Sequence, residues 1–205
     1  MACRVADVSD LTRLLLAIAA ANRTQARALL DGTPSLVNAR LTRADECFID
    51  RCHAQVYEGD TALHAAGFAY DHEMARELVA RGADVHASNR RGAQPLHAAV
   101  IGVPGTPNWD PPRQRAVIEY LIEAGADPDA TAAGGVTPLH RAVRNRCSAA
   151  VETLLHAGAD PDAANDRGST PSDLARRTTG RGGTGSAAAK AEQQIIIDLL
   201  RRATA

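Results

Sequence analysis

An internal repeat is the feature of this sequence that most limits what the chain can fold into. An eight-residue pattern that begins with glycine occurs four times, as GDTALHAA at Gly59, GAQPLHAA at Gly92, GVTPLHRA at Gly135 and, in weaker form, GSTPSDLA at Gly168. The four glycines are 33, 43 and 33 residues apart. A period of this length is typical of units that stack because none of them can bury its apolar face alone. The sequence therefore predicts a solenoid.

A second repeated marker shows where the long interval gains its ten extra residues. Gly-Ala-Asp begins at Gly82, Gly125 and Gly158, again 43 and 33 residues apart. The extra residues must therefore lie between the two markers of one unit. They are the proline-rich run 103–112, VPGTPNWDPP.

Each unit has the pattern of a helix, a turn, a second helix and an extended connection. Thr61 and Thr137 are suited to cap a first helix, whose first position tolerates proline because its N–H has no partner inside the helix. A second helix with an apolar stripe ends at the glycine of Gly-Ala-Asp, since glycine adopts the left-handed conformation that closes a helix. The expected fold class is all-α.

The signature Thr-Pro-Leu-His-x-Ala at a period of 33, followed by Gly-Ala-Asp, resembles the ankyrin repeat, and the chain is similar to ankyrin repeat proteins of bacterial type. The resemblance covers nearly all of the 205 residues. It implies one domain, 1–205, of about five helix-turn-helix units with short hairpin connections. The expected units are about 7–39, 56–88, 89–131, 132–164 and 165–205. The first and last depart most from the pattern, because end units face water on one side.

Three insertions, 40–55, 103–112 and 178–189, interrupt the repeat. The first joins units one and two, and we expect it to form an extended finger. The second carries Trp109, the only tryptophan. The second and third lie at corresponding places of alternate units, so they should project from one edge of the stack and wall off part of its concave face.

Composition argues against several classes of protein. The chain has 23 Lys and Arg against 24 Asp and Glu, a formal net charge of -1, which disfavours a nucleic-acid or anionic-membrane binder. It has no apolar run long enough to span a membrane, and its first residues lack the layout of a secretory signal. We therefore expect a cytoplasmic protein whose four scattered cysteines are reduced. We expect no cofactor.

The last helix carries three consecutive apolar residues, Ile195, Ile196 and Ile197. Three such positions span about 200° of a helix, more than one buried face needs. This pattern fits either a wide core stripe or a contact with another chain, so we expect a monomer or a weak homodimer.

The resemblance implies a non-enzymatic module that binds a partner protein or peptide. In the ankyrin family, partners are usually contacted by hairpin tips and by exposed positions of the first helices. With the inserted tryptophan, the expected contact residues are Tyr57, Glu58, Asp60, Phe68, Arg90, Arg91, Trp109, Arg141, Arg144, Asn145 and Arg167. Arginine and aromatic residues dominate the energetics of interfaces, although arginine is also almost the only base that this chain uses.

A second hypothesis is an enzyme or a binder of small molecules or anions. Its pocket would be closed by the insertions and lined by Trp109, Arg144, Arg146 and Arg181, with His97 or His140 as further candidates. The run 180–185 matches G-x-G-x-x-G, but it follows a helix, whereas the dinucleotide motif follows a strand. Ser186 can cap the last helix, and this helix start together with Arg181 could hold an anion. A flexible glycine-rich insertion is the simpler interpretation.

Three histidines, His64, His97 and His140, follow the repeated leucine. In the ankyrin family this position supports turns through hydrogen bonds between neighbouring units. We therefore expect a structural role, since a ring with two nitrogens suits a buried hydrogen-bond relay.

Cys47, Cys52 and His53 form a small cluster in the first insertion. They are candidate zinc ligands, but a zinc site of this kind needs a second pair of ligands, which the sequence lacks. A Cys52 nucleophile activated by His53 is a further hypothesis, weakened because adjacent residues of an extended chain point in different directions. We expect no metal.

Overall fold

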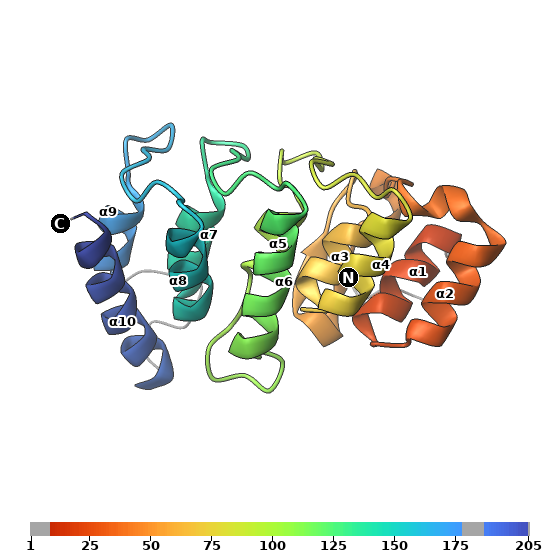
Figure 1. The fold of residues 1–205 in the computed structure, drawn as a ribbon, viewed down its shortest axis with the longest axis horizontal. Helices are drawn as coiled ribbons and strands as arrows, with labels where there is room; N and C mark the ends of the chain where they lie inside the picture. Colours follow the sequence, from red (N-terminus) through yellow and green to blue (C-terminus); the bar gives the residue numbers. More distant parts are fainter. Residues whose placement is uncertain (1–8, 178–186, 205) are drawn as a thin grey trace.

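The computed structural model describes residues 9–177 and 187–204, and in this part of the chain the α-helices form five successive pairs (Figure 1). The pairs are α1 (Asp10–Ala19) with α2 (Arg23–Gly32), α3 (Ala62–Phe68) with α4 (His72–Ala80), α5 (Pro95–Ala99) with α6 (Pro111–Glu123), α7 (Pro138–Asn145) with α8 (Ser148–His156), and α9 (Pro171–Arg176) with α10 (Ala187–Ala203). The predicted all-α solenoid is confirmed.

The helices stack in two layers, with the core between them. The first helices α1, α3, α5, α7 and α9 pack on one another in order, and so do α4, α6, α8 and α10 of the second layer. Equivalent leucines fill the core: Leu63, Leu96 and Leu139 of the first helices are fully buried. Each unit thus covers the apolar face of the next, as the repeat predicts.

Helix boundaries follow the capping residues. The side chain of Thr137 accepts a hydrogen bond from the backbone N–H of His140, which begins α7, and Asp71 and Asp110 cap α4 and α6 in the same way. The second helices are followed by Gly82, Gly125 and Gly158, whose φ angles are +92°, +102° and +87°. Only glycine adopts these angles without strain, so the sequence marker and the helix end coincide.

The tips of the connections between units are joined by backbone hydrogen bonds. Arg90 donates its N–H to the carbonyl of Glu58 at 2.7 Å, and Ala133 donates to the carbonyl of Arg91 at 2.8 Å. These bonds hold the tips of neighbouring connections side by side.

The first insertion forms a short antiparallel hairpin. After the 3-10 turn η1 (Pro34–Val37), it contains η2 (Arg43–Asp45), β1 (Cys47–Ile49), η3 (Asp50–Cys52) and β2 (Ala54–Val56), with Phe48 opposite Gln55. Leu41 and Asp60 are joined by a 2.8 Å backbone hydrogen bond at its base. The expected extended finger is wrong in one respect. Alternate side chains of both strands are buried in the core, so the hairpin lies on the stack.

The second insertion is anchored by a buried glutamine of α6. Gln114 is fully buried and donates its Nε2 to the carbonyl of Ala99 at 3.0 Å, while its Oε1 accepts the indole N–H of Trp109 at 3.1 Å. A Cβ at Gly105 in this insertion would lie 3.3 Å from Ala188 at the start of α10. This insertion therefore reaches the edge where the third one ends. Residues 178–186, with Arg181 and Ser186, lie outside the described residues.

None of the described helices is both long and apolar enough to cross a membrane.

Candidate functional site

A pocket of about 430 Å³ lies where the inserted hairpin meets the first-helix layer. We call it the arginine pocket, because three guanidinium groups, those of Arg91, Arg141 and Arg144, are part of its lining. Its other lining residues are Phe48, His53, Ala54, Gln55, Tyr57, His64, Phe68, Asn89, Ala93, Ala98, Ile101, Gly102, Val103 and Asn145. The first insertion contributes Phe48, His53, Ala54 and Gln55, and the second contributes Val103. The expected wall from the second and third insertions is not tested, because residues 178–186 lie outside the described residues.

The three arginines come from two neighbouring units. Arg91 follows the tip of the connection before α5, while Arg141 and Arg144 lie on α7. Arg141 is half-buried and donates Nη1 to the carbonyl of His97 at 3.2 Å, and Arg91 donates Nη1 to the hydroxyl of Tyr57 at 3.2 Å. Arg144 is exposed. No carboxylate of residues 9–177 or 187–204 lies within 4.0 Å of these three guanidinium groups.

Burial and nearby positive charge both lower the pKa of Arg141. Burial, followed by repulsion from Arg144 and Arg91, lowers its pKa to about 10. The group still carries its charge at neutral pH. Asp60, which is fully buried, attenuates this effect by its negative charge, but its oxygens already accept Asn89 Nδ2 and the N–H of Tyr57, each at 2.8 Å. The three arginines therefore make the pocket electropositive at neutral pH.

The remaining wall of the arginine pocket combines apolar and polar side chains. Phe48 of the hairpin and Phe68 of α3 contribute aromatic rings, and Ile101 and Val103 border the pocket from the second insertion side. The rings of Phe48 and His53 meet edge to face with centroids 5.2 Å apart, which packs the hairpin turn against its own strand. Charged and apolar groups thus meet in one concavity.

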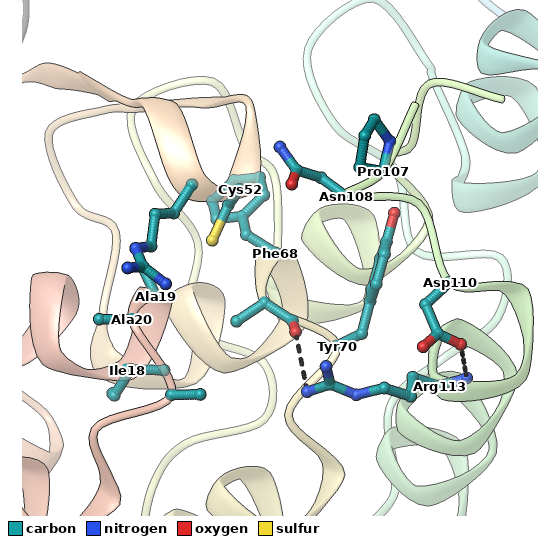
Figure 2. A pocket seen from close by; sticks show the side chains of 13 residues that line it. Ile18, Ala19, Ala20, Cys52, Phe68, Tyr70, Pro107, Asn108, Asp110 and Arg113 are labelled. Atoms are coloured by element: carbon teal, nitrogen blue, oxygen red, sulfur yellow. Dashed lines mark hydrogen bonds between the residues drawn. The ribbon is translucent and has the colours of Figure 1, made fainter. Parts of the chain in front are cut away.

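A second pocket, of about 390 Å³, lies on the other side of Phe68 (Figure 2). We call it the tyrosine pocket, after Tyr70, whose ring stands between Pro107 and Asn108 of the second insertion and Arg113 of α6. Its lining residues are Ile18, Ala19, Ala20, Ala21, Arg51, Cys52, Phe68, Ala69, Tyr70, Pro107, Asn108, Asp110 and Arg113. Arg113 donates Nη2 to the carbonyl of Ala69 at 3.4 Å, and Phe68 lines both pockets.

An ion pair holds the hairpin over these pockets. Arg90 donates to Glu46, and the carboxylate of Glu46 also accepts the N–H of Glu58 at 2.8 Å. Together these bonds lower the pKa of Glu46 to about 2. The guanidinium carbons of Arg90 and Arg91 lie 5.0 and 5.1 Å from the centroid of the Tyr57 ring. Cation–π contacts therefore position Tyr57 at the rim.

Several of the expected contact residues come together in the arginine pocket. Six of them line it: Tyr57, Phe68, Arg91, Arg141, Arg144 and Asn145. Glu58, Asp60 and Arg90 support its border through the bonds described above. Arg167 is exposed at a later tip and lines neither pocket.

Two residues expected in an enclosed pocket have other positions. Trp109 is half-buried against the core and donates its N–H to Gln114, so it anchors the second insertion. Arg146 ends α7 in the left-handed conformation, with φ of +59°, and is only 4% exposed. Neither lines the arginine pocket. Phe48, His53 and Gln55 line it, which the sequence does not predict because the first insertion has no equivalent in the other units.

The three repeated histidines make hydrogen bonds that join neighbouring units of the fold. Their Nε2 atoms lie within 3.1 Å of a carbonyl oxygen in the following unit: that of Ala93 for His64, Val136 for His97 and Ser169 for His140. Burial lowers the pKa of all three. The expected relay between units is confirmed, although His64 also contributes to the wall of the arginine pocket.

The cysteines of the hairpin differ from one another. Cys47 is disulfide-bonded, so the expectation of reduced thiols is wrong at this residue. Burial raises the pKa of Cys52 to about 11, which keeps it a thiol at neutral pH. Cys52 lines the tyrosine pocket whereas His53 lines the arginine pocket, so the two side chains do not form a pair. Among the residues that the structure describes, no three Cys, His, Asp or Glu side chains could hold a metal ion together.

Comparison with known families agrees with the arrangement of the helix pairs. A family model described as ankyrin repeats in three copies matches residues 16–132, which is more than half of the chain, and a second ankyrin-repeat model, for many copies, matches residues 121–175. A search of curated proteins finds no match. The repeated signature, the stacked helix pairs and the matches over 16–175 place this chain in the ankyrin repeat family.

Proposed function

We propose that this chain is a non-enzymatic recognition module that binds a partner protein or peptide at its concave face. Ankyrin repeats generally mediate protein–protein interactions, which supports the class of function. The observation that carries the proposal is the arginine pocket, where three arginines and the aromatic side chains of Phe48, Tyr57 and Phe68 gather in one concavity. These are the residue types that anchor interfaces when a partner covers them.

The pocket is already organised without a partner. Tyr57 is held by Arg90 and Arg91, Arg141 is tied to the backbone of α5, and the hairpin is fixed by the bond between Arg90 and Glu46. Binding would therefore order few additional side chains, and the free-energy cost of immobilising the site is small.

The hypothesis of an enclosed small-molecule site has less support. Of its four expected lining residues, Arg144 lines the arginine pocket, Trp109 and Arg146 line neither pocket, and Arg181 lies outside the described residues. The buried histidines and the protonated Cys52 also offer no activated base or nucleophile. These points favour a binding module over an enzyme.

We further propose a cytoplasmic protein with a protein partner and no nucleic-acid or membrane ligand. The formal net charge of -1 supports the part of this proposal that concerns nucleic acid and anionic membranes, since binders of polyanions usually carry a basic excess. Ile195 on α10 is 47% exposed, and it is the candidate contact of the proposed monomer or weak homodimer.

A peptide-display selection tests the proposed site. The purified wild type would be panned against a random peptide library, and the enriched peptides would be measured against Arg144→Glu and Arg167→Glu. Both arginines are exposed, but only Arg144 lines the arginine pocket, so Arg167→Glu is the matched control. We expect peptides that bind wild type and Arg167→Glu but not Arg144→Glu. Failure to enrich any peptide, or equal binding to both variants, would contradict the proposal. Circular dichroism checks that each variant is folded.

A further inference from the structure

We infer that the concave groove binds an extended acidic segment of its partner, with carboxylates placed against Arg91, Arg141 and Arg144. This inference rests on the proposed function, since it specifies the chemistry of the partner at the same site.

The first argument is that three arginines gather in one pocket without an ion pair. Some arginines outside the pocket pair with acidic side chains, such as Arg23 with Asp71 at 2.6 Å and Arg115 with Glu152 at 2.6 Å, whereas others, such as Arg167, have no ion pair with the described residues. In the arginine pocket, three guanidinium groups gather with no such partner among the described residues. A half-buried charge without a counter-charge costs free energy, and a partner's carboxylate would offset this cost.

The second argument is the mixture of charge and apolar surface. Phe48, Phe68, Ile101 and Val103 line the same pocket as the arginines. A free phosphate or a nucleic-acid backbone would meet the charges but leave these side chains uncovered. A peptide offers carboxylates and apolar side chains at alternating positions, so it matches both parts of the lining. The nearly balanced charge of the whole chain also disfavours a polyanion such as nucleic acid.

The third argument is that the two pockets lie on either side of Phe68. Phe68 lines both of them, while the hairpin turn places His53 in the arginine pocket and Arg51 with Cys52 in the tyrosine pocket. The tyrosine pocket also contains Arg113 and one carboxylate, that of Asp110, which accepts the backbone N–H of Arg113 at 3.0 Å (Figure 2). A segment that crosses Phe68 would meet arginines on both sides. We therefore expect acidic residues that flank an apolar residue.

The test uses the peptides that depend on Arg144 in the display selection. Their sequences should contain Asp and Glu at about three times the frequency in the starting library. Replacing these acids by Asn and Gln should weaken binding about tenfold or more, measured by fluorescence anisotropy of labelled peptides. Affinity should also fall when sodium chloride is raised from about 50 mM to about 300 mM, because exposed charges are screened.

Two variants locate the charge recognition. Arg144→Gln should weaken the acidic peptides but change the affinity of their Asn and Gln counterparts by less than about twofold, and Arg167→Gln should change neither. Both arginines are exposed, so the substitutions leave the buried core unchanged.

The outcomes separate the inference from the proposed function. Peptides that depend on Arg144 but show no enrichment in acids, or that bind equally well after amidation of their acids, would overturn the inference and leave the proposed function intact. The carboxylate assignment also fails if phosphoserine versions bind while Asp and Glu versions do not. If the selection yields no peptide that depends on Arg144, the proposed function and the inference both fail.

Discussion

The Nε2 atom of His97 lies 3.1 Å from the carbonyl oxygen of Val136, which belongs to the next unit of the stack. On the other side of the ring, Nδ1 accepts the N–H of Gln94, the residue that caps α5. The neutral ring with its proton on Nε2 satisfies both bonds, whereas a second proton on Nδ1 would face an N–H donor. His64 and His140 are bonded in the same way.

This arrangement predicts that the protein loses stability in mild acid. Burial lowers the pKa of His97 to about 3, while the unfolded chain binds a proton near pH 6.5. Between these values the unfolded state holds more protons, so the free energy of unfolding falls as the pH falls. For His97 the loss is on the order of 1 kcal/mol on going from about pH 7.5 to about pH 5.5. His64 and His140, whose pKa values are also lowered, act in the same direction.

Urea denaturation at the two pH values measures this effect. The exposed His156 provides a control, since His156→Gln should leave the pH dependence unchanged. Equal stability at about pH 5.5 and about pH 7.5 would show that the buried histidines are not kept neutral by the fold.

The close approach of α3 and α5 predicts a large effect of a single methyl group. A Cβ at Gly67 would lie 2.9 Å from the carbonyl oxygen of Pro95 and 3.1 Å from the N atom of Ala99. Both are backbone atoms and cannot move aside, so Gly67→Ala should destabilise the protein by about 1 to 3 kcal/mol. Gly32→Ala is the control, because nothing lies within 4 Å of its Cβ position. Chemical denaturation that finds the two variants equally stable would refute this explanation of the helix spacing.

The two hydrogen bonds of the Gln114 side chain predict that this residue holds the second insertion in place. In Gln114→Leu, the carbonyl of Ala99 and the indole N–H of Trp109 both lose their partner. We expect a loss of about 2 kcal/mol in the free energy of unfolding. The emission of Trp109, the only tryptophan, should shift to the red as the insertion loosens. The exposed Gln25→Leu should change neither quantity. An unchanged emission spectrum in Gln114→Leu would mean that Trp109 is held by packing alone.

The parts of the fold that repeat are the parts that sequence predicts well. Leu63, Leu96 and Leu139 occupy one repeated position and are all fully buried, and the histidine after each makes the same bond to the next unit. Stacking imposes the same physical environment on each copy, so four imperfect copies define the pattern.

The inserted segments have no second copy with which to be compared. The hairpin strands are three residues long, too short for an alternating pattern to reveal which side chains point inward. The contribution of Phe48 and His53 to the pocket, and the ion pair of Glu46 with Arg90, depend on how this hairpin folds back onto the next unit. The sequence does not predict that Trp109 is held by Gln114, because Gln114 lies five residues later, in a helix whose inner face resembles that of the other units.

The two ends of the inserted hairpin are joined by a pair of backbone hydrogen bonds. Leu41 exchanges backbone hydrogen bonds with Asp60 and Gly59, each 2.8 Å long, so the two ends of the excursion are brought together within the regular scaffold. Related proteins could therefore carry a different loop between these two ends while keeping the same repeat scaffold. Such proteins would differ in the ligands that they bind, although their repeating units would still show that they are related.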